Sequence, residues 1–90
     1  MNIRAHIVVK GMVQGVGFRY FVRQQAGRLG LCGSVRNLYD GNVDIQVQGD
    51  RSLIEEFIDI VKVGPRSARV IDLFIEWMEP SAEFTRFDIM

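Results

Sequence analysis

Cysteine and histidine each occur only once in this sequence, and their scarcity excludes several kinds of site. Cys32 has no second cysteine with which to form an internal disulfide, and one cysteine with one histidine cannot build a zinc site. A cysteine-dependent phosphatase would need an arginine at the far end of a phosphate loop, and Arg36 follows Cys32 too closely for that. We therefore expect a small buried cysteine, a cytoplasmic protein, and no metal or other cofactor.

Excess charge and long apolar runs are also absent. Lys plus Arg and Asp plus Glu both number 11, and a net charge of zero gives no electrostatic basis for binding nucleic acid or a membrane surface. Arg4, His6 and Lys10 interrupt the apolar residues near the N-terminus, so we expect no signal peptide and no membrane span there or later. His6 falls in the polar register and is expected to be solvated.

Hydrophobic residues make up 48% of the chain, which is typical of a folded globular protein. No linker, repeat or low-complexity segment divides the chain, so we expect residues 1–90 to form a single domain. A monomer is the default expectation, and the apolar Ile71 and Phe74 are the one hint of a partner.

Apolar periodicity predicts an alternation of strands and helices. Residues 3–10 alternate as a half-buried strand, whereas Phe18, Val22, Ala26 and Leu29 recur at helical spacing. The first helix should stop at Gly30. Strands are expected at 34–39 and 43–48, joined by an Asp40-Gly41 turn. A second helix should open at a capping box of Ser52 and Glu55 and end at Gly64 and Pro65, followed by a strand at 68–78 and a short strand with Phe87 and Ile89. This order predicts a ferredoxin-like βαββαβ sandwich, an α+β fold in which two helices cover one face of an antiparallel sheet with a short C-terminal edge strand.

The expected fourth strand does not alternate cleanly. Ile71, Leu73, Ile75 and Trp77 share one face, but Val70 and Phe74 add apolar groups to the other. Either a bulge or a partly covered outer face would explain this pattern, and the sequence does not decide between them. Trp77 itself is expected to lie in the core.

A glycine-rich segment, GMVQGVGFR at residues 11–19, lies between the first strand and the first helix. Its glycines allow the backbone to adopt positive φ and to point several N–H groups at one place, and the helix beginning near Phe18 adds the positive end of its dipole. Side chains in a helix lean toward its N-terminus, so Arg19 should lean over the loop and hold an oxyanion. The pattern indicates a phosphate site, with a structural turn and a solvated arginine as the alternative.

The same segment lacks the Lys-Ser/Thr of a nucleotide-binding loop and the acidic residues of a magnesium site. It resembles instead the first signature of the acylphosphatase family, and GSVRNLYDGNVDIQVQG (residues 33–49) is similar to the second. RLGLCG and GPRSARV (residues 64–70) are also similar to family members, so the resemblance extends over essentially the whole chain.

The resemblance implies hydrolysis of the carboxyl–phosphate anhydride of small-molecule acyl phosphates. It implies that Arg19 and the loop backbone bind the phosphate and that Asn37 positions the attacking water. The loop residues concerned are Gln14, Gly15, Val16, Gly17 and Phe18. Apart from the resemblance, an asparagine near a hairpin is commonly a local backbone hydrogen-bonder.

Two other functions fit the expected fold. One is a non-catalytic module that binds a phosphorylated ligand through the same loop, because a fold does not by itself determine a function. The other is an RNA-binding sheet, which would present aromatic residues on its third strand. Here the outward residues are Asp44, Gln46 and Gln48, so we expect no nucleic-acid partner.

One position departs from the family pattern: Ser34 stands where members usually carry an aromatic residue. Ser34 and Asn37 are three residues apart on the expected strand, so their side chains should point to opposite faces. We therefore expect the change to affect packing on the far face, and Asn37 only indirectly.

Overall fold

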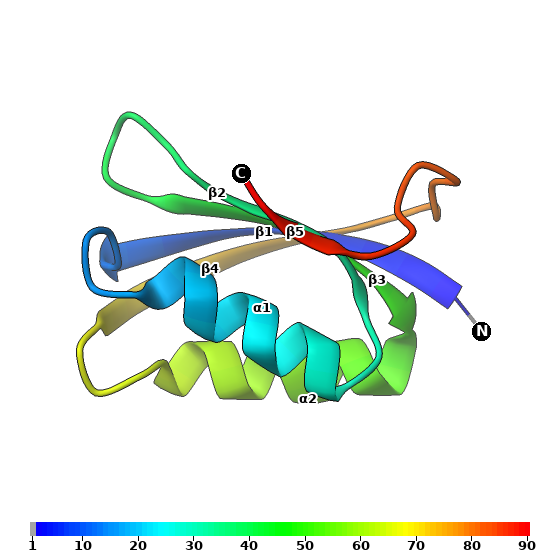
Figure 1. Ribbon diagram of the computed structural model, residues 1–90, viewed down its shortest axis with the longest axis horizontal. Coiled ribbons are helices and arrows are strands. Elements are labelled where there is room, and N and C mark those ends of the chain that lie inside the picture. Colours follow the sequence, from blue (N-terminus) through cyan, green and yellow to red (C-terminus); the bar gives the residue numbers. More distant parts are fainter. Residues whose placement is uncertain (1) are drawn as a thin grey trace.

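Residues 2–90 are described by the computed structural model, and they form two helices and five strands (Figure 1). In chain order these are β1 (Asn2–Met12), α1 (Phe18–Arg28), β2 (Cys32–Asn37), β3 (Val43–Asp50), α2 (Arg51–Val63), β4 (Arg69–Met78) and β5 (Phe87–Ile89). The strands form one sheet in the order β4-β1-β3-β2-β5, and both helices pack against the same face of it. The predicted ferredoxin-like order is confirmed. Neither helix in this part of the chain has the length and apolar character needed to cross a membrane.

The last strand makes the sheet mixed rather than purely antiparallel. Neighbours among β4, β1, β3 and β2 pair antiparallel, but β5 runs parallel to β2, with Ser34 opposite Asp88. In Figure 1 the β4–β5 connection lies at the opposite end of the molecule from the β2–β3 turn. β5 therefore runs back toward the end of the sheet at which α1 begins.

The core lies between the sheet and the helices. Side chains on the helix-facing side of β1 and β3 are fully buried, and so is one stripe of each helix. These residues are Ala5, Ile7, Val9, Val43, Ile45 and Val47 from the strands and Phe18, Val22, Ala26, Ile54, Phe57 and Val61 from the helices. Each large apolar side chain buried in this way stabilises the fold by about 1.5–3 kcal/mol, so the register of the central strands is strongly specified. Trp77, predicted to lie in the core, is only partly buried and packs against it, with the Arg51 guanidinium 4.2 Å from its ring centroid.

The end of α1 agrees with the prediction. The helix stops before Gly30, where the N–H groups of Gly30 and Leu31 donate to the carbonyls of Gly27 and Ala26 at 3.1 and 2.9 Å. This pair of bonds satisfies carbonyls that would otherwise be left without a partner in the last turn.

The capping box predicted for Ser52 and Glu55 is wrong. Asp50 is the N-cap of α2, because its Oδ1 accepts a hydrogen bond from the Ser52 N–H at 3.0 Å and another from the Ser52 hydroxyl. These two bonds lower the pKa of Asp50 below its ordinary value, and the bond from the Ser52 hydroxyl has the larger effect. Asp50 is the last residue of β3 and still extended, so it caps the helix two positions before the residue that the Ser-x-x-Glu pattern indicates.

β2 lies two residues earlier than predicted, at Cys32–Asn37. The turn takes up the residues that follow, since the Leu38 N–H donates to the Asn42 carbonyl at 2.9 Å. The hairpin predicted at Asp40-Gly41 is confirmed, because β2 and β3 pair antiparallel on either side of it. Cys32 is half-buried rather than buried, because it lies on the face of β2 that the helices do not cover.

β4 contains a bulge, which decides the alternative left open by the sequence. Lys10 lies opposite Asp72 and Gly11 lies opposite Val70, so Ile71 is the extra residue. The bulge turns Val70 toward the core and leaves Ile71 71% exposed. The bulge therefore explains the irregular positions 70 and 71, whereas Phe74, opposite Val8, remains an apolar group on the outer face and is 53% exposed.

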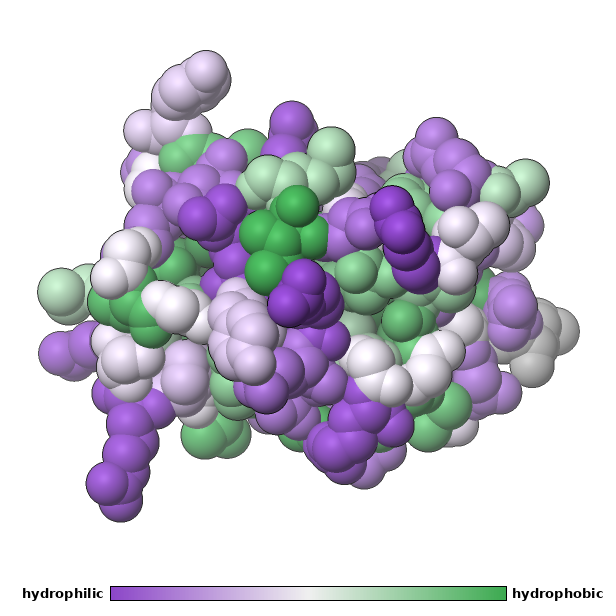
Figure 2. Space-filling model, in the orientation of Figure 1, coloured by the Kyte–Doolittle hydropathy of each residue, from purple (hydrophilic) through white to green (hydrophobic). Residues whose placement is uncertain are grey.

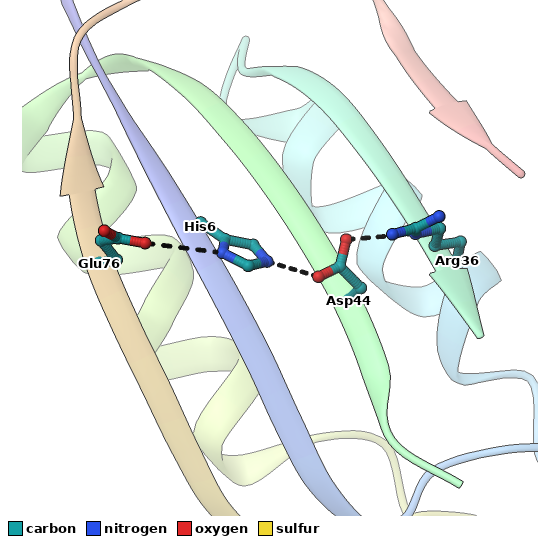
Figure 3. A network of polar contacts seen from close by, with 4 residues as sticks. All are labelled: His6, Arg36, Asp44 and Glu76. Carbon is teal, nitrogen blue, oxygen red and sulfur yellow. Dashed lines mark hydrogen bonds and ion pairs between the residues drawn. The ribbon is translucent and has the colours of Figure 1, made fainter. Parts of the chain in front are cut away.

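The face of the sheet away from the helices carries a network of polar side chains (Figure 3). His6 Nε2 lies 2.5 Å from Asp44 Oδ1, and Arg36 Nε lies 3.4 Å from Asp44 Oδ2. Glu76 Oε1 lies 3.9 Å from His6 Nδ1, so the network crosses β4, β1, β3 and β2. The expectation of a solvated His6 is therefore wrong, because strand pairing places a carboxylate beside it, and Asp44 is only 8% exposed.

Candidate active site

The loop between β1 and α1 presents an uncapped helix N-terminus. Gly17 is the N-cap residue, with φ 76° and ψ 17°, and Gly15 has φ 72°. These left-handed conformations cost other residues about 1–2 kcal/mol. Within residues 2–90 no side chain caps this helix, and its first backbone bond runs from the Phe21 N–H to the Gly17 carbonyl. The N–H groups of the first turn are therefore available to an anion, together with the positive end of the helix dipole.

Buried side chains hold this loop along its length. Val13 and Phe18, at its two ends, are each 1% exposed, and Phe18 packs on Phe21 with 6.2 Å between ring centroids. Val16, near the middle, is half-buried and packs against the core. The backbone of the loop is therefore positioned by apolar packing before any ligand binds.

Two polar side chains tie the loop to neighbouring segments. The Ser67 hydroxyl, on the connection between α2 and β4, donates to the Val16 carbonyl at 2.6 Å. The Gln14 side-chain amide donates from Nε2 to the carbonyls of Leu38 and Asn42 in the β2–β3 turn, both at 2.7 Å. Sequence reasoning missed Ser67, although it lies in a segment that is similar to family members, and it named Gln14 for its backbone rather than for its side chain.

Arg19 lies in the first turn of α1, as predicted, and is half-buried. Its Nη1 donates to the backbone carbonyl of Met90, directly after β5, at 2.8 Å. A guanidinium carries five N–H donors, so this bond orients Arg19 and leaves most of its donors for a ligand.

Asn37 is the last residue of β2, opposite Val43, and it is exposed. Its amide forms no hydrogen bond within the described residues, so a local backbone contact does not account for it. Because strand residues alternate, Asn37 shares the helix-facing side with the buried Val35. This places the free amide at the end of the sheet where α1 begins.

Arg19 and Asn37 line one cavity of about 180 Å³. The other residues around it are Val13, Gly15, Gly17, Phe18, Tyr20 and Ile89. Its volume lies below the roughly 300–1,000 Å³ of pockets for drug-sized ligands, which suits a small phosphorylated molecule. Figure 2 shows hydrophobic atoms over β5 surrounded by hydrophilic ones, so this side of the molecule has no broad apolar surface.

Only some of the loop residues predicted from the sequence to bind phosphate line the cavity. Gly15, Gly17 and Phe18 line it, together with Arg19 and Asn37. Gln14 and Val16 do not, because Gln14 turns its amide to the β2–β3 turn and Val16 packs on the core. The arrangement therefore brings uncapped backbone N–H groups, a guanidinium and an amide without a partner in the described residues to one cavity, a set of donors chemically suited to an anion.

Ser34 lies on the opposite face of the sheet from Asn37, as strand alternation predicts. It lines a separate cavity of about 410 Å³ with Arg4, Gln46 and Asp88 among others. The small serine side chain leaves this space open on the outer face. The departure from the family pattern therefore falls away from the cavity of Arg19 and Asn37.

Known proteins resemble this chain over almost its whole length. The acylphosphatase family model matches residues 5–89. A curated acylphosphatase of Moorella thermoacetica is 48% identical over 92% of this chain and 89% of its own length. The crystal structure of acylphosphatase from Bacillus subtilis superimposes with a TM-score of 0.94 at 36% identity, covering 98% of each chain. Full-length HypF in a phosphate- and nucleotide-bound form matches with a TM-score of 0.87 at 30% identity, over all of this chain and 12% of that one.

Proposed function

The chain belongs to the acylphosphatase family, and we propose that it hydrolyses acyl phosphates at the cavity shared by Arg19 and Asn37. The reaction converts the carboxyl–phosphate anhydride to a carboxylate and inorganic phosphate. In this proposal Arg19 and the N–H groups of the glycine loop bind the phosphate, and Asn37 orients the attacking water.

Phosphate binding needs donors that are in place before the substrate arrives. The uncapped N–H groups after Gly17 meet this need, because the loop is held by buried side chains on both sides. Arg19 adds a full positive charge, and its bond to Met90 limits the directions in which the guanidinium can point. These preorganised donors stabilise the negative charge that spreads over the phosphoryl oxygens in the transition state. Such stabilisation is the main source of catalysis in phosphoryl transfer.

The attacking water needs a polar partner that the protein itself does not occupy. The amide of Asn37 is such a group, since it lines the cavity and has no hydrogen bond to the described residues. Its carbonyl oxygen can accept from water while its NH₂ donates to a phosphoryl oxygen. Holding water in line with the bond to be broken is a gain in positioning rather than in acid–base chemistry.

The leaving group requires little help. Water forms a new bond to phosphorus, the bond between phosphorus and the acyl oxygen breaks, and the electron pair leaves with the carboxylate. The conjugate acid of that carboxylate has a pKa of about 4, so no general acid is required at neutral pH. The proton released by the water is shared between phosphate and solvent.

The observation that carries the proposal is the meeting of Arg19, Asn37 and the left-handed Gly17 around one small cavity. Hydrolysis of benzoyl phosphate, followed by its ultraviolet absorbance in the presence of EDTA, tests it. The Arg19→Ala variant should lose at least about 10²–10³-fold in kcat/KM, the usual effect of removing one transition-state donor.

Arg28→Ala is the matched control, because Arg28 lies in the last turn of the same helix and, among residues 2–90, its hydrogen bonds run to the side chain of Gln25. It should keep the wild-type rate. If the wild type turned over no faster than Arg19→Ala while still binding inorganic phosphate, the site would be a non-catalytic phosphate-binding module instead.

A further inference from the structure

We propose that the side chain of Gln14 is a positioning residue that sets Asn37 against the phosphate loop. It acts through the β2–β3 turn, residues 38–42, which follows Asn37 directly. The inference rests on the proposed role of Asn37 and assigns to Gln14 no contact with the substrate, since Gln14 does not line the cavity.

One amide group makes the whole connection. Gln14 Nε2 lies 2.7 Å from the Leu38 carbonyl oxygen and 2.7 Å from the Asn42 carbonyl oxygen. These two residues close the turn on itself, because the Leu38 N–H donates to the Asn42 carbonyl at 2.9 Å. Gln14 therefore bonds to both the first and the last residue of the turn, and Leu38, the first, directly follows Asn37 in the chain.

The turn has few other connections. Its remaining hydrogen bonds are internal, from the Gly41 N–H to the Leu38 carbonyl and from Asn42 to the Asp40 carboxylate. Within the described residues, the bonds to Gln14 are the hydrogen bonds that join the turn to the rest of the protein. Figure 1 shows the turn standing away from the helices at one end of the sheet, and Tyr39 at its tip is fully exposed.

Glutamine suits this position for a chemical reason. Both partners are carbonyl oxygens, which can only accept, so the amide must present its nitrogen and both hydrogens to them. A carboxylate at this position would donate neither hydrogen and would repel both oxygens. Asparagine carries the same amide on a chain that is shorter by one methylene, so it would not reach both carbonyls.

Removing the Gln14 amide should affect phosphate binding and the position of Asn37 differently. The phosphate loop is held independently by Val13, Phe18 and the bond from Ser67 to Val16. Loss of the Gln14 amide should therefore leave phosphate binding largely intact while Asn37, at the end of β2, moves relative to the loop. A displacement of about 1 Å in a positioning group can cost about 10²-fold in rate.

The test compares Gln14→Met, which keeps the length and removes the polar group, with Gln14→Asn. Both should lower kcat on benzoyl phosphate by about 10- to 100-fold, whereas the inhibition constant of inorganic phosphate should change by less than about threefold. Introduced into an Asn37→Ala background, Gln14→Met should lower kcat by less than about threefold again, because the group through which it acts is already missing.

Gln48→Met is the matched control. Gln48 also makes two side-chain hydrogen bonds to backbone, with the carbonyl and N–H of Ser81 at 2.9 and 2.7 Å, at the other end of the sheet. It should lower the midpoint of thermal unfolding by a similar amount and leave kcat unchanged.

Two results would overturn the positioning role alone. One is an inhibition constant for phosphate that rises as much as kcat falls in Gln14→Met, which would mean that Gln14 supports only the loop. The other is a full loss from Gln14→Met in the Asn37→Ala background. An Asn37→Ala variant with wild-type kcat would instead overturn the proposed role of Asn37 itself, and the role of Gln14 with it.

Discussion

Replacing glycine by alanine near the two ends of α1 should change the stability of the protein in opposite directions. Gly17 is the N-cap residue with φ 76°, whereas Gly27 lies within the last turn of the helix at an exposed position. At neither position would an added Cβ meet a neighbouring heavy atom within 4 Å. The sign of each effect therefore depends on backbone conformation and not on packing.

The magnitudes follow from the two conformations. Alanine at Gly27 should raise the free energy of unfolding by about 0.8–1.0 kcal/mol, the difference in helix propensity between the two residues. Alanine at Gly17 must adopt a left-handed conformation and should lower it by about 1–2 kcal/mol. The two variants should thus differ by roughly 2–3 kcal/mol, and each kcal/mol shifts the unfolding midpoint of a domain of this size by roughly 4–8 °C.

Urea denaturation at 25 °C, followed by circular dichroism, measures both changes, provided that the m-value stays constant. Competitive inhibition by inorganic phosphate shows in parallel whether the loop keeps its shape. Gly27→Ala should leave the inhibition constant unchanged, and Gly17→Ala should raise it if the loop relaxes to relieve the strain. A Gly17→Ala variant with wild-type stability and wild-type phosphate binding would refute the reasoning about the N-cap.

Two further predictions concern the supports of the fold and the loop. Ser67→Ala should raise the inhibition constant of phosphate by about 2- to 10-fold, because the Val16 carbonyl loses a hydrogen bond worth about 0.5–1.5 kcal/mol, and Ser67→Thr should restore it. Asp50→Ala should destabilise the protein most at neutral pH. The folded protein lowers the pKa of this carboxylate, so Asp50 contributes its full stability at pH values above the ordinary pKa of 3.8 and loses that contribution as the pH falls through the folded-state pKa. Urea denaturation of both proteins from pH 7 down to pH 3 should show the difference shrinking, and a constant difference would contradict the assignment of Asp50 as the cap.

Local features of the chain were predicted well where one physical cause dominates. The helical spacing from Phe18 and the stop at Gly30 gave α1 almost to the residue, because an apolar stripe and a glycine each have one strong interpretation. The start of α2 failed where two interpretations competed. Both Asp50 and Ser52 are good N-cap residues, and only the extended end of β3 selects the former.

Features that depend on pairing between strands were not accessible in the same way. The bulge at Ile71 follows from its neighbours on β1, and the contact of His6 with Asp44 joins residues 38 positions apart. Alternation assigns a residue to a face but does not say what lies opposite it. His6 therefore looked solvated in the sequence but contacts Asp44 in the structure.

By itself, the sequence determined the order of elements, the glycine-rich loop before the first helix, and the two signatures that single out Arg19 and Asn37. These depend on local backbone preference and on residue spacing, which the chain carries directly. The tertiary structure alone decided that Arg19 and Asn37 line one cavity, that Met90 orients Arg19, that Ser67 bonds to the loop, and that Gln14 bonds to the β2–β3 turn. Such contacts arise when segments distant in the chain pack side by side, and the residue types that make them do not specify their partners.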